Sequence, residues 1–158
     1  MITIIAAVSK NNVLGYKNKL PWKIKLEMKH FLDSTKNQNV LFGFNTFKHL
    51  PKIYQNWKII VLTKNHKNDL ILQKKNILVF SDINEVIRKY QKNSTNLFVC
   101  GGAKIYEQFL EHATHLIISV INKDYIGDVF FPKLNYSNWK LIKIKKYQLF
   151  NVKYYQKI

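Results

Sequence analysis

The sequence contains very little cysteine, arginine or acid. Cys100 is the only cysteine, which excludes an internal disulfide and a cysteine-rich metal site and favours a reducing compartment. No apolar run approaches the roughly 18 residues that a membrane helix needs. Residues 1–8 are apolar, but no basic stretch precedes them and no signal-peptide cleavage pattern follows. We therefore expect a cytoplasmic protein with no membrane segment.

Acidic residues are scarce: 9 stand against 26 basic ones, which gives a formal net charge of +17. Arg88 is the only arginine, so lysine supplies nearly all of the positive charge. A field of this strength can attract nucleic acid or another polyanion. The lysines are scattered along the whole chain, however, and this pattern favours a solvated basic surface over a nucleic-acid site.

Core-forming side chains, by contrast, are abundant. Of the 158 residues, 47% are hydrophobic and 14% aromatic, which excludes a disordered chain and suffices for the core of one domain spanning residues 1–158. Short apolar runs typical of buried strands recur along the sequence. These runs lie at residues 2–8, 40–42, 59–62, 77–80, 97–100 and 116–121.

Segments with helical features lie between these runs. Two of them carry apolar residues at helical spacing, at Ile24, Met28, Phe31 and Leu32 and at Ile105, Phe109 and Leu110. The third begins with a capping box, formed by Asp82 and Glu85 before residues 86–91. In residues 139–158 polar and apolar side chains alternate instead, and the alternation is interrupted at residues 148–151. This pattern predicts a β-hairpin. The pattern predicts a single-domain α/β fold with a mostly parallel central sheet and an antiparallel C-terminal edge strand.

Glu27 is the most informative single residue. On a helix it shares a face with Ile24 and Phe31, so its carboxylate would lie in the apolar stripe. Burial there costs several kcal/mol without a partner and raises the pKa toward values useful for acid–base catalysis. Alternatively, Glu27 lies at the margin of the stripe, in the first turn, where the helix dipole favours an acid. Spacing alone leaves both interpretations open.

A pair of glycines, Gly101 and Gly102, stands between an apolar run and a predicted helix. Such a junction presents backbone N–H groups and the positive end of a helix to an anion. It lacks the Gly-Lys-Ser/Thr ending of a phosphate-binding loop and the three glycines of a dinucleotide fingerprint. Taken alone, the pair is more typical of a tight packing turn.

The segment Leu20-Pro21-Trp22 follows a polar loop and precedes the first predicted helix. It is either a turn with a packing aromatic or a lid beside a ligand pocket, and periodicity does not choose between them. The 5 histidines show no metal spacing. His112 and His115 lie three apart without a further ligand nearby, so we expect no metal site.

Together these segments resemble dihydrofolate reductase over the whole chain. The resemblance lies in the order and spacing of many positions rather than in one motif. These are Ile4, Ile5, Ala6, Ala7, Gly15, Leu20, Pro21, Trp22, Glu27, Phe31, Gly43, Thr46, Phe47, Ile60, Val61, Leu62, Thr63, Gly101, Gly102, Tyr106, Gly127, Asp128, Phe131 and Pro132. The resemblance implies a monomer with eight strands in the sheet and about four flanking helices. It also implies hydride transfer from NADPH to the pterin of dihydrofolate.

The resemblance assigns catalysis to Glu27, Trp22 and Leu20. Glu27 would accept two parallel hydrogen bonds from a ring N–H and the adjacent amino group of the pterin, and would help to protonate N5 through water near Trp22. Residues 11–22 would form a mobile lid that Asp128 helps to hold closed. The implied substrate contacts are Ile5, Ala7, Glu27, Met28, Phe31, Leu50, Lys52, Trp57, Cys100, Tyr106 and Ser119.

The resemblance also implies a cofactor site that includes a cis peptide bond between Gly101 and Gly102. Phe44 stands where a basic residue commonly meets the 2′-phosphate of NADPH, but Lys64 and Lys104 are cations nearby. NADPH therefore remains the expected cofactor. Its implied contacts are Ala7, Leu14, Gly15, Leu20, Gly43, Phe44, Asn45, Thr46, Leu62, Thr63, Lys64, Cys100, Gly101, Gly102, Ala103, Lys104, Ile105 and Tyr106.

Trp57 is the main departure from the family's pattern. It occupies the position of an arginine that clamps the α-carboxylate of folate's glutamate tail. Lys52 and Lys58 are the nearest cations, and a lysine supplies a point charge without the planar two-pronged bond. Loss of the arginine favours an alternative, a same-fold NADPH reductase for another pteridine or a pyrimidine, of the riboflavin-pathway type. Glu27 argues for a pterin substrate. A nucleic-acid-binding protein is the alternative outside the class of enzymes.

Overall fold

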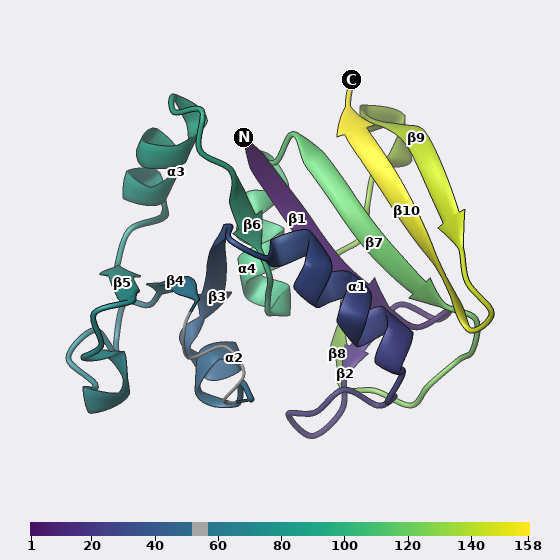
Figure 1. The fold of residues 1–158 in the computed structure, drawn as a ribbon, viewed down its shortest axis with the longest axis horizontal. Helices are drawn as coiled ribbons and strands as arrows, with labels where there is room; N and C mark the ends of the chain where they lie inside the picture. The colour runs from purple at the N-terminus through teal and green to yellow at the C-terminus, as the bar shows by residue number, and fades with distance from the viewer. Residues whose placement is uncertain (52–56) are drawn as a thin grey trace.

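The computed structural model describes residues 1–51 and 57–158, and an eight-stranded sheet forms its middle layer (Figure 1). The strand order is β5-β4-β3-β6-β1-β7-β10-β9. The strands are β1 (Ile2–Val8), β3 (Asn39–Gly43), β4 (Lys58–Leu62), β5 (Ile77–Phe80), β6 (Leu97–Val99), β7 (His115–Ile121), β9 (Trp139–Lys146) and β10 (Phe150–Lys157). Pairing is parallel from β5 through to β7 and antiparallel at β10. This confirms the predicted mostly parallel sheet with an antiparallel C-terminal edge.

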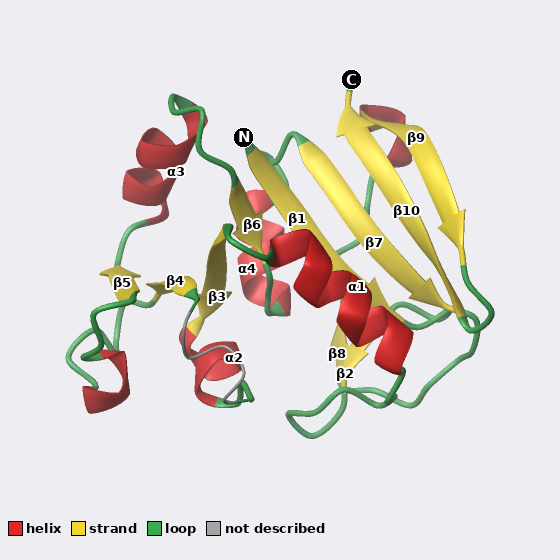
Figure 2. Ribbon diagram, in the orientation of Figure 1, coloured by secondary structure: helices red, strands yellow, loops and turns green. Residues whose placement is uncertain are grey.

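The described residues form four α-helices, as expected, on the two faces of the sheet (Figure 2). They are α1 (Lys25–Thr35), α2 (Phe44–Lys48), α3 (Ile83–Gln91) and α4 (Ala103–Phe109), with 3-10 turns η2 (Leu70–Leu72) and η3 (Tyr136–Asn138). In Figure 1, α1 lies in front of the sheet and α4 behind it. Asp82 caps α3, because its carboxylate accepts a hydrogen bond from the Asn84 N–H (2.9 Å).

Strand β1 is apolar except for the buried Thr3, because both faces of the sheet are covered. Successive side chains of a strand point to opposite faces. Ile4 therefore packs with α4 residues such as Phe109, whereas Ile5 packs in the cluster that includes Phe42 on the other side. The α1 face of the sheet is the one that carries Ile5, Phe31 and the candidate site.

The C-terminal hairpin turns slightly earlier than predicted. β9 ends at Lys146 and β10 begins at Phe150, so the turn covers residues 147–149. Phe150 and Asn151 were predicted to lie in the break, but Phe150 is fully buried against the core and starts the strand. The two-stranded sheet of β2 (Val13–Gly15) and β8 (Val129–Phe130) was not predicted, because such short strands show no alternation.

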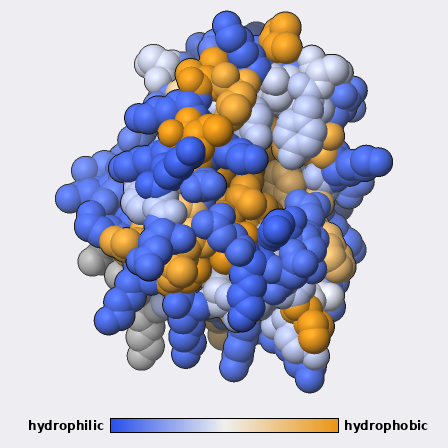
Figure 3. All heavy atoms as spheres, turned by 90° about the vertical axis from the view of Figure 1, so that its right-hand side faces the viewer, coloured by the Kyte–Doolittle hydropathy of each residue, from blue (hydrophilic) through white to orange (hydrophobic). Residues whose placement is uncertain are grey.

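The outer edge strand β9 mixes lysines with exposed apolar side chains. Seen from this side, hydrophilic residues surround small apolar areas (Figure 3). Leu141, Ile142 and Ile144 are each about half exposed, and Lys143 and Lys145 alternate with them. Lysines on an edge strand oppose pairing with another strand. Among the described residues, no helix is long and apolar enough to cross a membrane.

Candidate active site

Glu27 lies inside the protein, on the face of α1 that meets the sheet. Only 6% of its surface is exposed, and the Ser119 hydroxyl donates a hydrogen bond to its carboxylate. Ser119 stands opposite Ala7 in the parallel register of β7 and β1. Burial raises the pKa of Glu27 to about 7, and the bond from Ser119 partly offsets this rise. Of the two interpretations of its spacing, burial is the one that the structure shows.

Tyr106 and Cys100 lie near Glu27, and burial keeps both of them neutral. The Tyr106 hydroxyl donates a hydrogen bond to the Ile5 carbonyl (2.8 Å), which ties α4 to the middle of β1. Burial raises the pKa of Tyr106 well above its ordinary value, and burial also raises the pKa of the Cys100 thiol. A neutral thiol is a poor nucleophile. Glu27 is therefore the group in this part of the site whose proton equilibrium lies near neutral pH.

Trp22 is buried directly before α1, in a cluster that includes Ala7 and Ile24. Its ring meets Tyr125 edge-on, with centroids 5.4 Å apart. The indole Nε1 has no hydrogen-bond partner among the described residues. A buried donor without a partner costs free energy, so this N–H is a candidate contact for a ligand. Leu20, two residues earlier, is 48% exposed.

The loop before Trp22 is fastened at two places. Asn11 exchanges two hydrogen bonds with the backbone of Tyr125, at 2.8 and 3.0 Å. The Asp128 carboxylate accepts a hydrogen bond from the Lys17 N–H (3.1 Å), and the Asp128 N–H donates to the Gly15 carbonyl (3.0 Å). The structure therefore places Asp128 against the loop that the sequence predicts to be a lid.

A cradle of glycines lies where β3 and β6 end. The Gly43 N–H donates to the Gly101 carbonyl (2.8 Å), and the Gly101–Gly102 peptide bond is cis, as expected. A Cβ atom on Gly43 would lie 2.9 Å from Ile105 Cγ1, and one on Gly102 would lie 3.1 Å from Thr46 Oγ1. The glycines thus let the strand ends pack closely against Ile105 and Thr46 and leave a backbone turn without side chains, as dinucleotide sites of α/β sheets use. The cradle fits the dinucleotide that the sequence predicts.

The structure brings most of the predicted cofactor residues to the carboxyl ends of adjacent parallel strands. Ligands of open α/β sheets bind at this edge. The order β4-β3-β6 unites three segments: Leu62, Thr63 and Lys64; Gly43, Phe44, Asn45 and Thr46; and Cys100, Gly101, Gly102, Ala103, Lys104, Ile105 and Tyr106. Lys104 is exposed on α4, and none of the contacts found among the described residues ties it to the cradle.

Comparison with known proteins decides the family. A sequence model described as dihydrofolate reductase matches residues 1–156. The chain belongs to the dihydrofolate reductase family. The dihydrofolate reductase of Mycoplasma genitalium is 35% identical over 158 residues, covering 99% of this chain and 98% of that protein.

Two further comparisons bear on architecture. A solved structure of dihydrofolate reductase from Enterococcus faecalis, complexed with NADP(H) and RAB-propyl, has a TM-score of 0.84 and 24% identity, covering 99% of this chain and 96% of that chain, which shows the shared fold. The segregation and condensation protein A of Mycoplasmoides gallisepticum is 34% identical over 157 residues, which are 99% of this chain and 26% of that protein. A dihydrofolate reductase-like segment thus also occurs within a longer protein.

In this member of the dihydrofolate reductase family, an aromatic pair continues the site beyond Glu27. Phe31, one helical turn after Glu27, stacks on Trp57 with ring centroids 6.3 Å apart and an interplanar angle of 21°. Met28 and Leu50, also predicted to contact substrate, are half-buried on this side of the protein. Lys52, a predicted substrate contact, lies outside the described residues.

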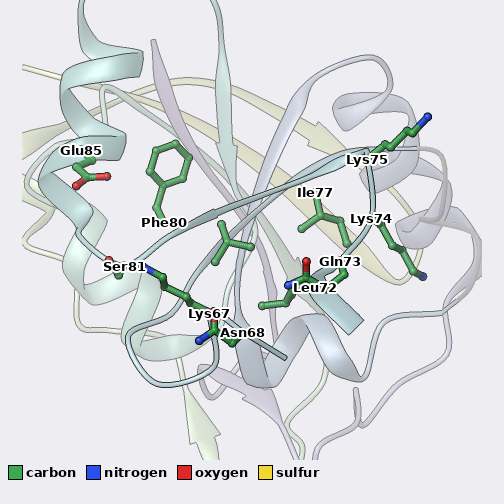
Figure 4. Close-up of a pocket in the computed structure, with 11 residues that line it drawn as sticks. Lys67, Asn68, Leu72, Gln73, Lys74, Lys75, Ile77, Phe80, Ser81 and Glu85 are labelled. Atoms are coloured by element: carbon green, nitrogen blue, oxygen red, sulfur yellow. The ribbon is translucent and has the colours of Figure 1, made fainter. Parts of the chain in front are cut away.

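A groove of about 650 Å³ lies away from this site, beside the edge strand β5 (Figure 4). It is lined by Lys67, Lys74 and Lys75, with Glu85 at the start of α3 as its acidic side chain. It contains neither Glu27 nor the glycine cradle. The described residues hold no cluster of three or more histidine, cysteine or acidic side chains that could bind a metal.

Sequence reasoning missed two features of the site. His66 was assigned no role beyond the lack of metal spacing among the histidines, but its ring stacks on Phe44 with centroids 4.1 Å apart. Tyr125 was not considered, yet it contacts both Trp22 and Asn11. Neither carries a motif of its own, and each becomes visible only when segments distant in the sequence meet.

Proposed function

We propose that this chain reduces dihydrofolate to tetrahydrofolate with NADPH, and that Glu27 binds and protonates the pterin ring. The observation that carries the proposal is the buried Glu27 carboxyl group, whose pKa is raised to about 7. Bound NADPH would supply a hydride to C6 of the ring's N5=C6 bond, and a proton would be added to N5. Members of the dihydrofolate reductase family carry out this reaction, and the chain matches the family over residues 1–156.

Glu27 suits both halves of this role. As a carboxylate it can accept two parallel hydrogen bonds from a ring N–H and an amino group, a geometry that fixes the pterin in one orientation. With a pKa near 7 it also holds a proton on a substantial fraction of molecules at neutral pH. A hydrogen bond from the Ser119 hydroxyl favours the charged form of the carboxyl group.

Trp22 and the loop before it would exclude water from the reacting rings. The unpartnered Nε1 of Trp22 is positioned to donate to a substrate atom or to a water on the way to N5. Leu20 is exposed in the loop that precedes it, so movement of that loop can bring Leu20 over the reacting rings. Exclusion of water strengthens each polar contact inside the pocket.

The tail end of the substrate would be held differently from the ring end. The stacked pair Phe31–Trp57 offers an aromatic surface to the aminobenzoyl ring. Arg88, the only arginine, lies on α3. The pair therefore supports binding through ring stacking rather than through a guanidinium–carboxylate clamp. It also favours the second candidate, reduction of a related pteridine or a pyrimidine that lacks a charged tail.

The purified chain tests the proposal through NADPH oxidation followed by absorbance. Dihydrofolate and a tail-less dihydropterin are offered separately, and a pyrimidine of the riboflavin pathway is offered third. We expect turnover of both pterins and none of the pyrimidine. Turnover of the pyrimidine alone would establish the second candidate, whereas NADPH binding without turnover of any substrate would contradict both. The cytosolic setting and the monomeric state stay predictions.

A further inference from the structure

The buried side chains of α1 are polar, and they belong to Glu27, His30 and Thr35. The Thr35 hydroxyl donates a hydrogen bond to the Phe31 carbonyl (2.7 Å). The Glu27 carboxylate accepts one from Ser119. His30 is 9% exposed, and its Nε2 atom has no hydrogen-bond partner among the described residues. His30 is therefore a buried polar group of the site helix to which the proposed reaction gives no role.

His30 joins α1 to the C-terminal hairpin. Its ring meets the ring of Tyr154 edge-on, with centroids 6.5 Å apart and an interplanar angle of 87°. Aromatic rings favour this arrangement. Tyr154 lies in β10 and packs in the cluster that includes Trp22, and Lys143 Nζ of β9 lies 5.7 Å from the centroid of its ring. The contact therefore links the helix that carries Glu27 to both strands of the hairpin.

Two contacts, one helical turn apart, hold α1 against the sheet. Glu27 and His30 are three residues apart and share one face of the helix. Glu27 meets Ser119 of β7, and His30 meets Tyr154, which is paired with Ile117 of the same strand. Ile117 and Ser119 point to one face of the sheet, because they are two residues apart. A shift of α1 at His30 would therefore also move the carboxylate of Glu27.

The charges around this contact oppose a proton on the His30 ring. Burial and the nearby Lys145 lower the pKa of His30 from its ordinary value of 6.5, and Asp33 partly offsets this. Asp33 is exposed and paired with Lys29. Because the pKa is lower in the folded state, the contact is fully stable above pH 6.5 and loses stability as pH falls below this value. The charged and titratable groups near the contact are Lys29 and Asp33 of α1, Lys143 and Lys145 of β9, Tyr147 of the turn and Tyr154 of β10.

We propose that His30 is a positioning residue: its neutral ring seats α1 on the C-terminal hairpin and holds Glu27 opposite Ser119, and a proton on the ring loosens this seat. A buried charge without a hydrogen-bonded partner is strongly disfavoured, so a charged ring favours movement of α1 away from Tyr154. The inference rests on the role of Glu27 in the proposed function, but the seating of α1 can be measured without substrate.

Amide hydrogen exchange of residues 25–35 at pH 7 and pH 5 measures the seating. The parent chain for this test is Glu27→Gln, which removes the other titrating group of the buried face. Protection factors of α1, corrected for intrinsic exchange rates, should fall about tenfold at pH 5 in the parent. His30→Phe keeps the ring contact without a nitrogen and should stay protected at both pH values. His30→Arg carries a permanent charge and should be poorly protected at both.

The matched control is His112→Phe, at a half-buried position after α4, which should keep the pH dependence of the parent. Kinetics in the chain with Glu27 intact then connect the seating to the reaction. At pH 7, His30→Arg should raise the KM for dihydrofolate about tenfold, whereas His30→Phe should keep the native KM. Below pH 6.5, the ratio of the native KM to that of His30→Phe should rise as pH falls.

Equal loss of α1 protection on acidification in the parent and in His30→Phe would overturn the inference, as would full protection of α1 in His30→Arg. If His30→Arg does not fold, the comparison of the parent with His30→Phe decides the inference by itself. The exchange measurement is independent of catalysis. A chain whose α1 behaves as expected but that does not reduce dihydrofolate would contradict the proposed function and leave the seating of α1 by His30 standing.

Discussion

The Ser119 hydroxyl of β7 donates a hydrogen bond to the buried Glu27 carboxylate of α1. This bond works against burial, since a donor stabilises the charged form that burial disfavours. Ser119→Ala should therefore raise the pKa of Glu27 further above its present value of about 7. The expected rise is about one pKa unit, because a hydrogen bond to a charged group contributes about 1.5 kcal/mol or more.

The pH profile of NADPH oxidation with dihydrofolate measures this shift. The descending limb of the profile should move to higher pH in Ser119→Ala, because Glu27 keeps its proton longer. Ser137→Ala alters an exposed serine in η3 and is the control. If the profile of Ser119→Ala does not move, the descending limb does not report the titration of Glu27.

Glu27 should also make the stability of the protein depend on pH. Its pKa is about 7 in the folded state against an ordinary value of 4.5, so the folded state binds more protons between these values. Stability therefore falls as pH rises from 4.5 through about 7, and the loss is complete above that window. At about 1.4 kcal/mol per pKa unit, the loss is at most about 3.5 kcal/mol.

Glu27→Gln removes this loss. The variant should gain stability relative to the native chain above neutral pH, and the gain should shrink as pH falls toward 4.5. Urea unfolding at several pH values measures the difference. Glu107→Gln, at an exposed position of α4, should show no such trend. A constant difference between Glu27→Gln and the native chain at every pH would refute the raised pKa.

Gly101 is the glycine of the cradle whose backbone tolerates substitution least. Its φ of +120° is rarely adopted by residues with a side chain, and an added Cβ would lie 3.3 Å from the Tyr106 hydroxyl. Gly101→Ala should cost about 1 kcal/mol or more of unfolding free energy and weaken NADPH binding. Gly15→Ala should cost less, because an added Cβ there would meet its nearest neighbour at 3.4 Å. Thermal melts with and without NADPH compare the two.

The residue at position 57 should determine how much the glutamate tail of the substrate contributes to kcat/KM. The native chain should reduce dihydrofolate and dihydropteroate, which lacks the glutamate, with similar kcat/KM. Trp57→Arg should raise the ratio in favour of dihydrofolate about tenfold, because a charged hydrogen bond contributes about 1.5 kcal/mol or more. Trp57→Phe keeps a ring on Phe31 and should leave the ratio unchanged. A native preference for dihydrofolate that is lost in Trp57→Phe would contradict the stacking account.

The central strands could be predicted because their apolar runs are buried on both faces of one sheet. β1, for example, has the predicted bounds of Ile2 and Val8 and is buried at every position except Ala7. The helix α2 could not, because its five residues, Phe44–Lys48, are too few to show a helical period. Local periodicity thus accounts for the layers of the fold and misses its shortest elements.

The site was predicted less completely, because its geometry depends on register. Helical spacing placed Glu27 on an apolar face, but only the pairing of Ala7 with Ser119 places a hydroxyl opposite the carboxylate. Phe44 begins α2, His66 lies in the loop after β4, and the two meet because β3 and β4 are neighbours. No sequence pattern within either segment contains that relationship.

Glu27 is proposed to supply both the proton and the contacts for the pterin. The rate of NADPH oxidation with dihydrofolate tests this role when it is measured across neutral pH for the native chain, Glu27→Asp and Glu27→Gln. Activity of the native chain should fall as pH rises through about 7. Glu27→Asp should keep that dependence, whereas Glu27→Gln should lose about 100-fold or more of the rate with unchanged NADPH affinity. Native turnover in Glu27→Gln would contradict the claim.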